Sequence, residues 1–161
     1  MQRFKITKEG YNKLKTDLNR LIGVERIKIS KAIGEAIELG DLSENTEYSS
    51  SKERQLINEA LIATLGEKIS NADVIDTDNL SGDSIDFGAT VTLFDEDLGK
   101  QICYTLLSEF EADPLRHVIS VNSPIGNALL GKRIGESAEI RIPGGTKYYM
   151  IKNIKWGGEN K

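Results

Sequence analysis

The chain has 161 residues, of which 39% are hydrophobic and 29% charged, and its formal net charge is −4. This composition predicts a soluble globular protein with one large or two small domains, and the acidic balance argues against broad nucleic-acid binding, which needs a basic face. No apolar run approaches the roughly 20 residues of a membrane span, and the first residues lack the apolar core of a secretory signal.

A single cysteine and a single histidine limit the chemistry further. With Cys103 alone no intrachain disulfide can form, which fits a reducing cytoplasm, and we expect this residue to be a small buried side chain in an apolar strand. With His117 alone, a metal site built from several histidines is excluded.

A long helix is predicted from Lys8 to about Leu39, with Thr7 as its N-cap. Its first half repeats apolar residues at spacings of three and four, as in a coiled coil. These residues are Tyr11, Leu14, Leu18 and Leu21. Near Gly23 the apolar stripe changes phase, and a shift of this kind locally unwinds a supercoil. The mainly basic charges of this shaft are interpreted as a solvated face.

A second helix is expected to begin near Ser43, and the short connection makes the two helices a hairpin. Its seam follows a spacing of three and four through positions 48, 51, 55, 58, 62, 65, 69 and 72. The residues near the base of the hairpin are apolar there, whereas Ser51, Gln55 and Asn58 are polar. We therefore expect a well-packed base and a looser end near the tip.

The tip of this hairpin is acidic, and Gly40 suits the end of the first helix. Residues 34 to 51 contain no Lys or Arg and five acids, which are Glu35, Glu38, Asp41, Glu44 and Glu47. Two explanations remain open. Asp41 and Glu44 have the spacing of a capping box for the second helix, which the spacing alone favours. Alternatively, the cluster binds a divalent metal, which better explains acids in the last turn of the first helix, where the dipole repels them.

Beyond a polar linker at 71 to 86, the periodicity becomes that of strands. Strands are predicted at 87–94, 102–107, 139–142 and 148–156, with a short one possible at 118–121, and a two-turn helix is predicted at 123–131. Turns are expected at 95–100, where Asp95 to Asp97 are interpreted as solvated charges, and at 143–145. The predicted fold class is therefore α+β, with a helical hairpin followed by a small antiparallel sheet and one short helix.

Two motifs resemble a known family. Gly40-Asp41-Leu42-Ser43-Glu44-Asn45 with Glu47-Tyr48 resembles the tip motif of the Gre family of bacterial transcript-cleavage factors. The block from Ile119 to Ile125, running on to Leu130-Gly131-Lys132, is similar to the C-terminal signature of that family, and Pro143-Gly144-Gly145 fits too. The resemblance covers essentially the whole chain. It implies a coiled-coil hairpin domain at 1–76 and an FKBP-like polymerase-docking domain at 77–161.

The resemblance also implies a function. The chain is expected to enter the secondary channel of bacterial RNA polymerase and to stimulate cleavage of backtracked nascent RNA by the polymerase, without being an enzyme itself. Asp41 and Glu44 are the expected catalytic and metal-holding residues, for a Mg²⁺ shared with the polymerase and weakly bound in the free protein. Lys52 and Arg54 are expected to contact the RNA 3′ end. Ser123, Pro124 and Ile125 are the expected polymerase contacts.

One departure from the family concerns Ile37, which stands where the family often has a basic residue, so we expect a weaker grip on the transcript. An FKBP-like fold does not itself imply prolyl isomerase activity. The expected protein is a cytoplasmic monomer without a membrane partner. Two alternatives remain: a channel regulator of the same shape that inhibits the polymerase without stimulating cleavage, and a coiled-coil adaptor or holdase.

Overall fold

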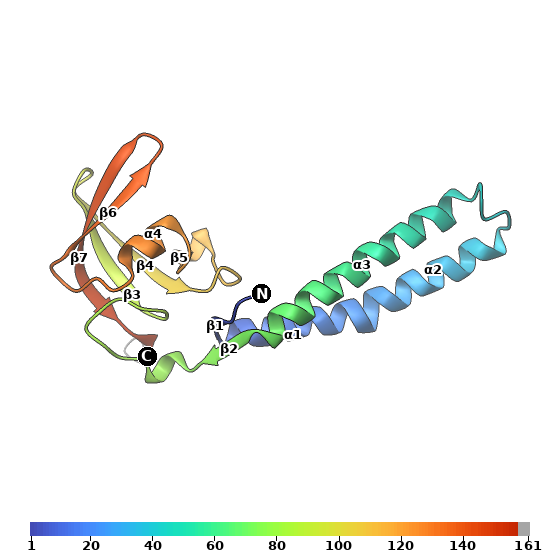
Figure 1. Ribbon diagram of the computed structural model, residues 1–161, viewed down its shortest axis with the longest axis horizontal. Helices are drawn as coiled ribbons and strands as arrows, with labels where there is room; N and C mark the ends of the chain where they lie inside the picture. The colour runs from blue at the N-terminus through green and yellow to red at the C-terminus, as the bar shows by residue number, and fades with distance from the viewer. Residues whose placement is uncertain (158–161) are drawn as a thin grey trace. The chain divides into compact units, whose positions relative to one another are not determined.

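The computed structural model describes residues 1–157, and its elements are labelled in Figure 1. The chain forms two compact units. The first contains Met1–Arg3 and Tyr11–Ala72, and the second contains Phe4–Gly10 together with the chain from Asp73 onward. The division expected from the sequence, at residue 76, stays a prediction, and the short segment Phe4–Gly10 lies with the second unit.

The first unit is a helical hairpin, as predicted. Its first arm comprises α1 (Lys8–Arg20), a π-helical turn (Leu21–Glu25) and α2 (Arg26–Glu38), and its second arm is α3 (Thr46–Ser70). Thr7 caps α1, because its hydroxyl accepts the Gly10 N–H at 3.0 Å. None of the helices within residues 1–157 has the length and apolar character that a membrane span requires.

The predicted change of phase near Gly23 is confirmed, and the π-helical turn explains it. The buried residues of the first arm are Leu14, Leu21, Ile29 and Ala36. Their spacings are seven, eight and seven, so one extra residue falls between Leu21 and Ile29. A π-helical turn holds one more residue than an α-helical turn, which keeps the buried stripe on the same side of the helix.

The expectation of a tighter base is wrong. The fully buried residues of α3 are Ser51 and Asn58, in the half nearer the tip, whereas Ile62, Leu65 and Ile69 are half-buried. The closest helix packing in the hairpin is that of α2 on α3. The distance between packed helices depends on the side chains at the contact, so small residues let the backbones approach where bulky ones hold them apart.

The second unit is built on a five-stranded sheet in the order β5-β4-β3-β7-β6. Its strands are β3 (Thr90–Asp95), β4 (Lys100–Leu107), β5 (Val118–Ser120), β6 (Ser137–Ile142) and β7 (Gly145–Lys155). The predicted strands and the α+β class are confirmed. One detail differs, since β5 runs parallel to β4 while the other pairs are antiparallel. The connection between β4 and β5 contains a short helical turn (Pro114–Arg116). It is long enough for the chain to return toward the start of β4, so that β5 can run in the same direction as β4.

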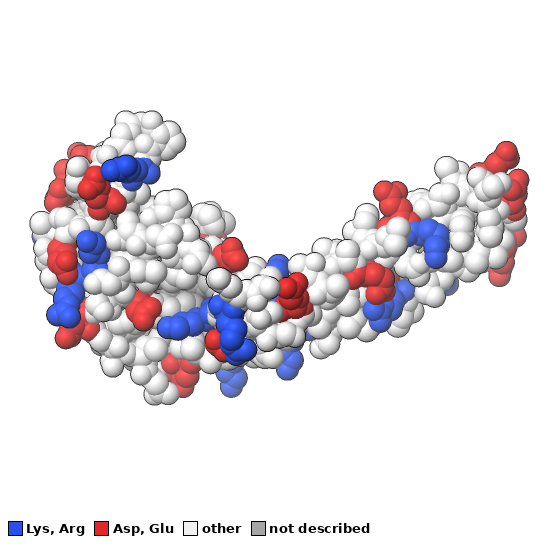
Figure 2. Space-filling model, in the orientation of Figure 1, with Lys and Arg blue, Asp and Glu red and all other residues white. Residues whose placement is uncertain are grey.

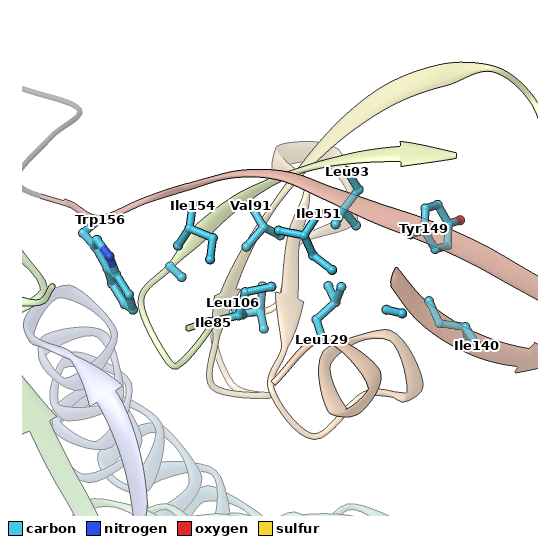
Figure 3. Packing of buried hydrophobic residues seen from close by; sticks show 12 residues of the cluster. Ile85, Val91, Leu93, Leu106, Leu129, Ile140, Tyr149, Ile151, Ile154 and Trp156 are labelled. Carbon is cyan, nitrogen blue, oxygen red and sulfur yellow. The ribbon is translucent and has the colours of Figure 1, made fainter. Parts of the chain in front are cut away.

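The core of this unit lies between the sheet and the short helix α4 (Pro124–Leu129). Figure 3 shows Leu129 of α4 pointing toward Leu106 and Ile151 of the sheet, and these three side chains are fully buried. At one end of the cluster the indole N–H of Trp156 donates to the carbonyl of Gly82 at 3.2 Å. This packing fixes α4 on the sheet.

A small second sheet was not expected. It pairs β1 (Phe4–Thr7) with β2 (Ala72–Ile75), inside the stretch predicted to be a linker. The segment that contains β1 is held by Glu111, whose carboxylate accepts the N–H of Thr7 at 3.2 Å and the hydroxyl of Ser108 at 2.8 Å. It also accepts the hydroxyl of Thr7. A Cβ at Gly10 would overlap the Glu111 carboxylate, so this side chain can take its present position only beside a glycine.

Two side chains of the sheet differ from expectation. Cys103 is exposed on β4 rather than buried, with its Sγ 3.4 Å from the Thr92 hydroxyl. Asp95 is buried rather than solvated, with 5% of its surface exposed. It accepts the N–H groups of Asp97 and Leu98 and a hydrogen bond from Lys147 Nζ at 3.1 Å, which organises the turn between β3 and β4.

Candidate functional site

The tip of the hairpin is the loop between α2 and α3. Two consecutive residues of this loop have positive φ angles, +78° at Gly40 and +40° at Asp41. Gly40 follows the end of α2, as predicted, in the left-handed conformation that commonly ends helices. Asp is among the few residues other than glycine that adopt positive φ readily, so its place here has a backbone reason as well.

Asn45 closes the tip by capping both helices. Its Oδ1 accepts the N–H of Tyr48 at 3.0 Å, which caps α3. Its Nδ2 donates to the carbonyl of Ala36 at 2.6 Å and to that of Gly40 at 3.2 Å, which satisfies the end of α2. The second helix therefore begins at Thr46 and not near Ser43. This capping role was not predicted, although an asparagine before an acidic first turn is a recognisable capping signal.

The capping-box explanation for Asp41 and Glu44 is therefore wrong, because Asn45 performs the capping. Residues 41 to 44 are all exposed. Asp41 Oδ1 accepts the hydroxyl of Ser43 at 2.9 Å, and the N–H of Glu44 donates to the Asp41 carbonyl at 3.2 Å. Figure 2 shows acidic atoms gathered at the end of the hairpin. Both side chains are therefore exposed, and neither of them caps α3.

The donor set of this loop suits a hard cation. Carboxylate oxygens are the ligands that Mg²⁺ prefers, but it takes six of them in octahedral geometry. Within residues 1–157, no group of three or more His, Cys, Asp or Glu side chains could hold a metal ion. Asp41 and Glu44 thus fit part of a coordination shell, and other molecules would have to complete it.

The two basic residues expected to contact RNA do not share one face of α3. Residues two apart on a helix point about 200° apart, since each residue turns the helix by 100°. Lys52 is exposed, and its Nζ donates to Gln55 Oε1 at 2.9 Å. Arg54 borders a shallow groove of the hairpin that Ile57 and Asn58 also line. Ile37, near the end of α2, has half of its surface exposed.

The expected docking segment begins α4, and the predicted helix is confirmed. Ser123 is the N-cap, because its Oγ accepts the N–H of Gly126 at 3.0 Å and donates to the Ser120 carbonyl at 2.7 Å. Pro124 is exposed at the first helical position. Ser123 thus has a structural role, which fixes how Pro124 and Ile125 are presented.

Ile125 is half-buried and lines an apolar pocket of about 420 Å³. The other lining residues are Tyr104, Ala112, Pro114, His117, Val118, Ile119, Ser120 and Ser123. Burial raises the pKa of the Tyr104 hydroxyl, which stays neutral in this setting. The sequence singles out Ser123 and Ile125 but not Tyr104 or Pro114, because these lining residues come from other parts of the chain.

Comparison with known proteins identifies the class. A model described as "Transcription elongation factor, N-terminal" matches residues 4–74, and one described as "Transcription elongation factor, GreA/GreB, C-term" matches residues 80–156. The helical hairpin and the sheet that these ranges cover are thus those of a transcription elongation factor. The chain belongs to the GreA/GreB family, whose members stimulate the RNA cleavage activity of RNA polymerase and are not enzymes themselves.

Relatives named transcription elongation factor GreA align over nearly the whole chain. That of Beijerinckia indica is 47% identical over 154 residues, which cover 96% of this chain and 98% of the relative. That of Orientia tsutsugamushi strain Ikeda is 43% identical over 156 residues, which cover 97% and 98%. Among solved structures, the GreA factor homolog Gfh1 of Thermus thermophilus is 29% identical, covers 96% of this chain and 99% of its own, and has a TM-score of 0.44.

Proposed function

We propose that this protein enters the secondary channel of bacterial RNA polymerase and presents Asp41 and Glu44 to the active centre, where they help to hold Mg²⁺ during cleavage of backtracked RNA. The observation that carries the proposal is the role of Asn45. Because this amide caps both helices, the two carboxylates have no capping duty and remain exposed. Family membership supports the polymerase as the partner.

A Mg²⁺ ion at this place would supply Lewis-acid chemistry, lowering the pKa of a water and stabilising the leaving oxygen. The chain's own part is to deliver hard oxygen ligands. The hydroxyl of Ser43 donates to Asp41 Oδ1 and limits the directions that this carboxylate can take. Two carboxylates alone bind Mg²⁺ weakly, so the polymerase and the RNA would supply the remaining ligands. This arrangement couples the chemistry to the polymerase complex.

Contacts with the nascent RNA are proposed for Lys52 and Arg54. Both lie within the first three turns of α3, close to the acidic tip. Because they point to different sides of the helix, they contact different phosphates rather than forming a single clamp. The apolar Ile37 in place of a base supports the weaker grip on the transcript that the sequence predicts.

Docking to the polymerase is proposed for Ser123, Pro124 and Ile125. Ile125 and the apolar pocket beside it offer a place for an apolar side chain of the partner, and Pro124 stands exposed next to it. Burial of one large apolar side chain contributes about 1.5–3 kcal/mol. We propose that the protein acts as a monomer.

The test uses stalled elongation complexes with RNA labelled at its 5′ end, incubated with and without this protein. Faster RNA shortening with the protein present is expected, provided that Mg²⁺ is present. If the protein binds polymerase but slows or leaves unchanged the cleavage, it is an inhibitor of the same shape. If it does not co-purify with polymerase at all, the adaptor or holdase alternative is favoured.

A further inference from the structure

The π-helical turn of the hairpin is defined by a hydrogen bond across five residues. The N–H of Arg26 donates to the carbonyl of Leu21. In a continuous α-helix the same carbonyl would accept from Glu25 instead. The turn contains Gly23, where added side-chain atoms would meet nothing within 4 Å. Crowding around Gly23 therefore does not determine which form the turn takes.

A second donor reaches the carbonyl of Leu21 from the other helix. Asn58 of α3 donates through Nδ2 at 3.2 Å, and only 6% of its surface is exposed. A buried amide without a partner costs free energy, so this side chain favours any backbone form that offers it a carbonyl. The carbonyl of Leu21 thus accepts both the N–H of Arg26 and the side-chain amide of Asn58.

The neighbouring residue of α3 holds the other end of the same turn. Glu59 accepts from Nε of Arg26 at 2.8 Å and from Nη2 at 2.9 Å. This bidentate pair raises the pKa of Arg26 and lowers that of Glu59, chiefly through the side-chain hydrogen bonds. Two consecutive residues of α3 thus contact the first residue of the turn and the residue that follows it.

The form of this turn decides which side of α2 faces α3. If the turn became α-helical, every later residue of the first arm would rotate by about 100° relative to α1. Ile29 and Ala36 would then leave the buried seam that they now occupy. Since α2 leads directly into the tip loop, its rotation also sets the direction in which Asp41 points.

We propose that Asn58 is a positioning residue: it selects the π-helical form of the turn and thereby fixes the rotation of α2 and the direction of Asp41 and Glu44. A buried asparagine at a seam position is a known means of fixing register at a cost in stability. This inference rests on the proposed function for its effect on cleavage. Its structural half, the rotation of α2, can be measured without polymerase.

The first variant is Asn58→Leu, which fills the same seam with an apolar side chain. The hairpin is expected to stay folded with an unchanged or raised melting temperature, while α2 adopts more than one rotation. Cleavage at saturating protein should fall about tenfold or more, since small misplacement of a catalytic group is costly. The concentration for half-maximal cleavage should not change. Ser51→Ala, another buried polar seam residue, is the matched control and should behave like the parent.

The second variant tests why the asparagine is needed. Deleting Gly23 removes the extra residue, so the buried spacing becomes seven throughout and no π-helical turn is required. Adding this deletion to Asn58→Leu should restore most of the lost cleavage. If the double variant is no better than the single one, or if Asn58→Leu cleaves like the parent, the proposal is overturned.

Spin labels on exposed positions Lys31 and Glu53, with Cys103→Ser, give the readout without polymerase. The parent should show one distance and Asn58→Leu a broadened or shifted distribution. If the distribution is unchanged although cleavage falls, Asn58 does not act through α2 and the proposal fails. The distance distribution of Asn58→Leu could shift as expected while Asp41→Asn, made in the parent, stimulates cleavage normally. The rotation of α2 would then be supported, and the function proposed for the tip would fail.

Discussion

The side-chain amide of Asn45 lies 2.6 Å from the main-chain carbonyl of Ala36, and this bond ties the start of α3 to the end of α2. The hairpin is therefore closed by a neutral residue. The acids around it can change without removing a cap, which makes the tip a place where folding and chemistry can be tested separately.

Asp41→Asn should abolish most cleavage while leaving the fold intact. Asparagine also tolerates the positive φ of this position, whereas alanine would add strain. The variant loses the charge that a hard cation needs. Because each 1.36 kcal/mol of lost transition-state stabilisation lowers the rate tenfold, we expect the cleavage rate to fall about a hundredfold or more. Glu44→Gln should behave similarly. The measurement is RNA shortening in stalled complexes at saturating protein.

Glu47→Gln is the control for that experiment. Glu47 lies in the first turn of α3, where its charge interacts favourably with the helix dipole. Its loss should cost a few tenths of a kcal/mol of stability and little cleavage. Competition with the parent for polymerase should be unchanged in all three variants. If Asp41→Asn stimulated cleavage as strongly as the parent, Asp41 would not be a metal ligand.

Asn45→Ala should loosen the tip. The variant loses the cap of α3 and the donor to Ala36, and loss of an N-cap costs about 1 kcal/mol. Amide hydrogen exchange at Tyr48 should speed up. Asn45→Asp keeps the acceptor for Tyr48 but loses the donor, so it should protect Tyr48 while leaving the end of α2 frayed. If the Tyr48 N–H exchanged equally fast in both variants, the double role of the Asn45 side chain would be contradicted.

Acid should weaken the second unit through Asp95. Burial raises the pKa of this carboxyl, but the hydrogen bonds from Leu98, Lys147 and Asp97 outweigh it and bring the pKa below its ordinary value. The stabilisation is therefore present above the unfolded pKa and is lost as pH falls through the lower folded pKa. Melting temperatures across this range should fall less steeply for Asp95→Asn, which is less stable at neutral pH. Asp97→Asn should follow the parent, and a parallel curve for Asp95→Asn would refute the assignment.

The docking proposal can be separated from stability with two residues of α4. Ile125→Ala and Leu129→Ala both remove apolar contacts, and the second should destabilise more, by about 2–5 kcal/mol, because Leu129 is fully buried. Leu129 is absent from the pocket lining, which contains Ile125. Under conditions where both variants are folded, only Ile125→Ala should bind polymerase more weakly. Equal affinities would show that the pocket does not contact the partner.

The free protein should bind Mg²⁺ weakly and cut no RNA. Two carboxylates supply too few of the six ligands that this ion takes. Titration calorimetry with Mg²⁺ should show little heat at micromolar protein, and a polymerase-free preparation should leave RNA intact. Tight binding, or Mg²⁺-dependent cleavage by a preparation shown to lack polymerase, would mean that the chain carries a complete site.

The helices, strands and phase shift could be predicted because they depend on local spacing. Spacings of three and four predict the helical hairpin, alternation predicts the strands, and the break in the apolar stripe predicts a change of phase near Gly23 but not the π-helical turn that produces it. Spacing failed at the tip, because Asp41 with Glu44 has the pattern of a cap and Asn45 nearby has the chemistry of one. Whether Asp41 or Asn45 caps α3 depends on where the loop turns. The turn is set by the positive φ angles of Gly40 and Asp41.

Features that join distant residues could not be predicted at all. The pocket beside Ile125 draws one wall from Tyr104 and Val118, and its existence follows from how β5 pairs with β4. The local sequence predicts a solvated Asp95, because its partner Lys147 lies 52 residues away. In each case the deciding contact comes from another strand.

The bond between Thr7 and Glu111 has a consequence for synthesis. These residues are 104 positions apart, so the first strand leaves the ribosome long before the carboxylate that holds it exists. At a translation rate of about 5–20 residues per second, Phe4–Gly10 waits for several seconds or longer without its acceptor. A recombinant fragment that starts after the hairpin would lack Phe4–Gly10 altogether. The unit made of the sheet is thus completed by residues that are translated before the hairpin.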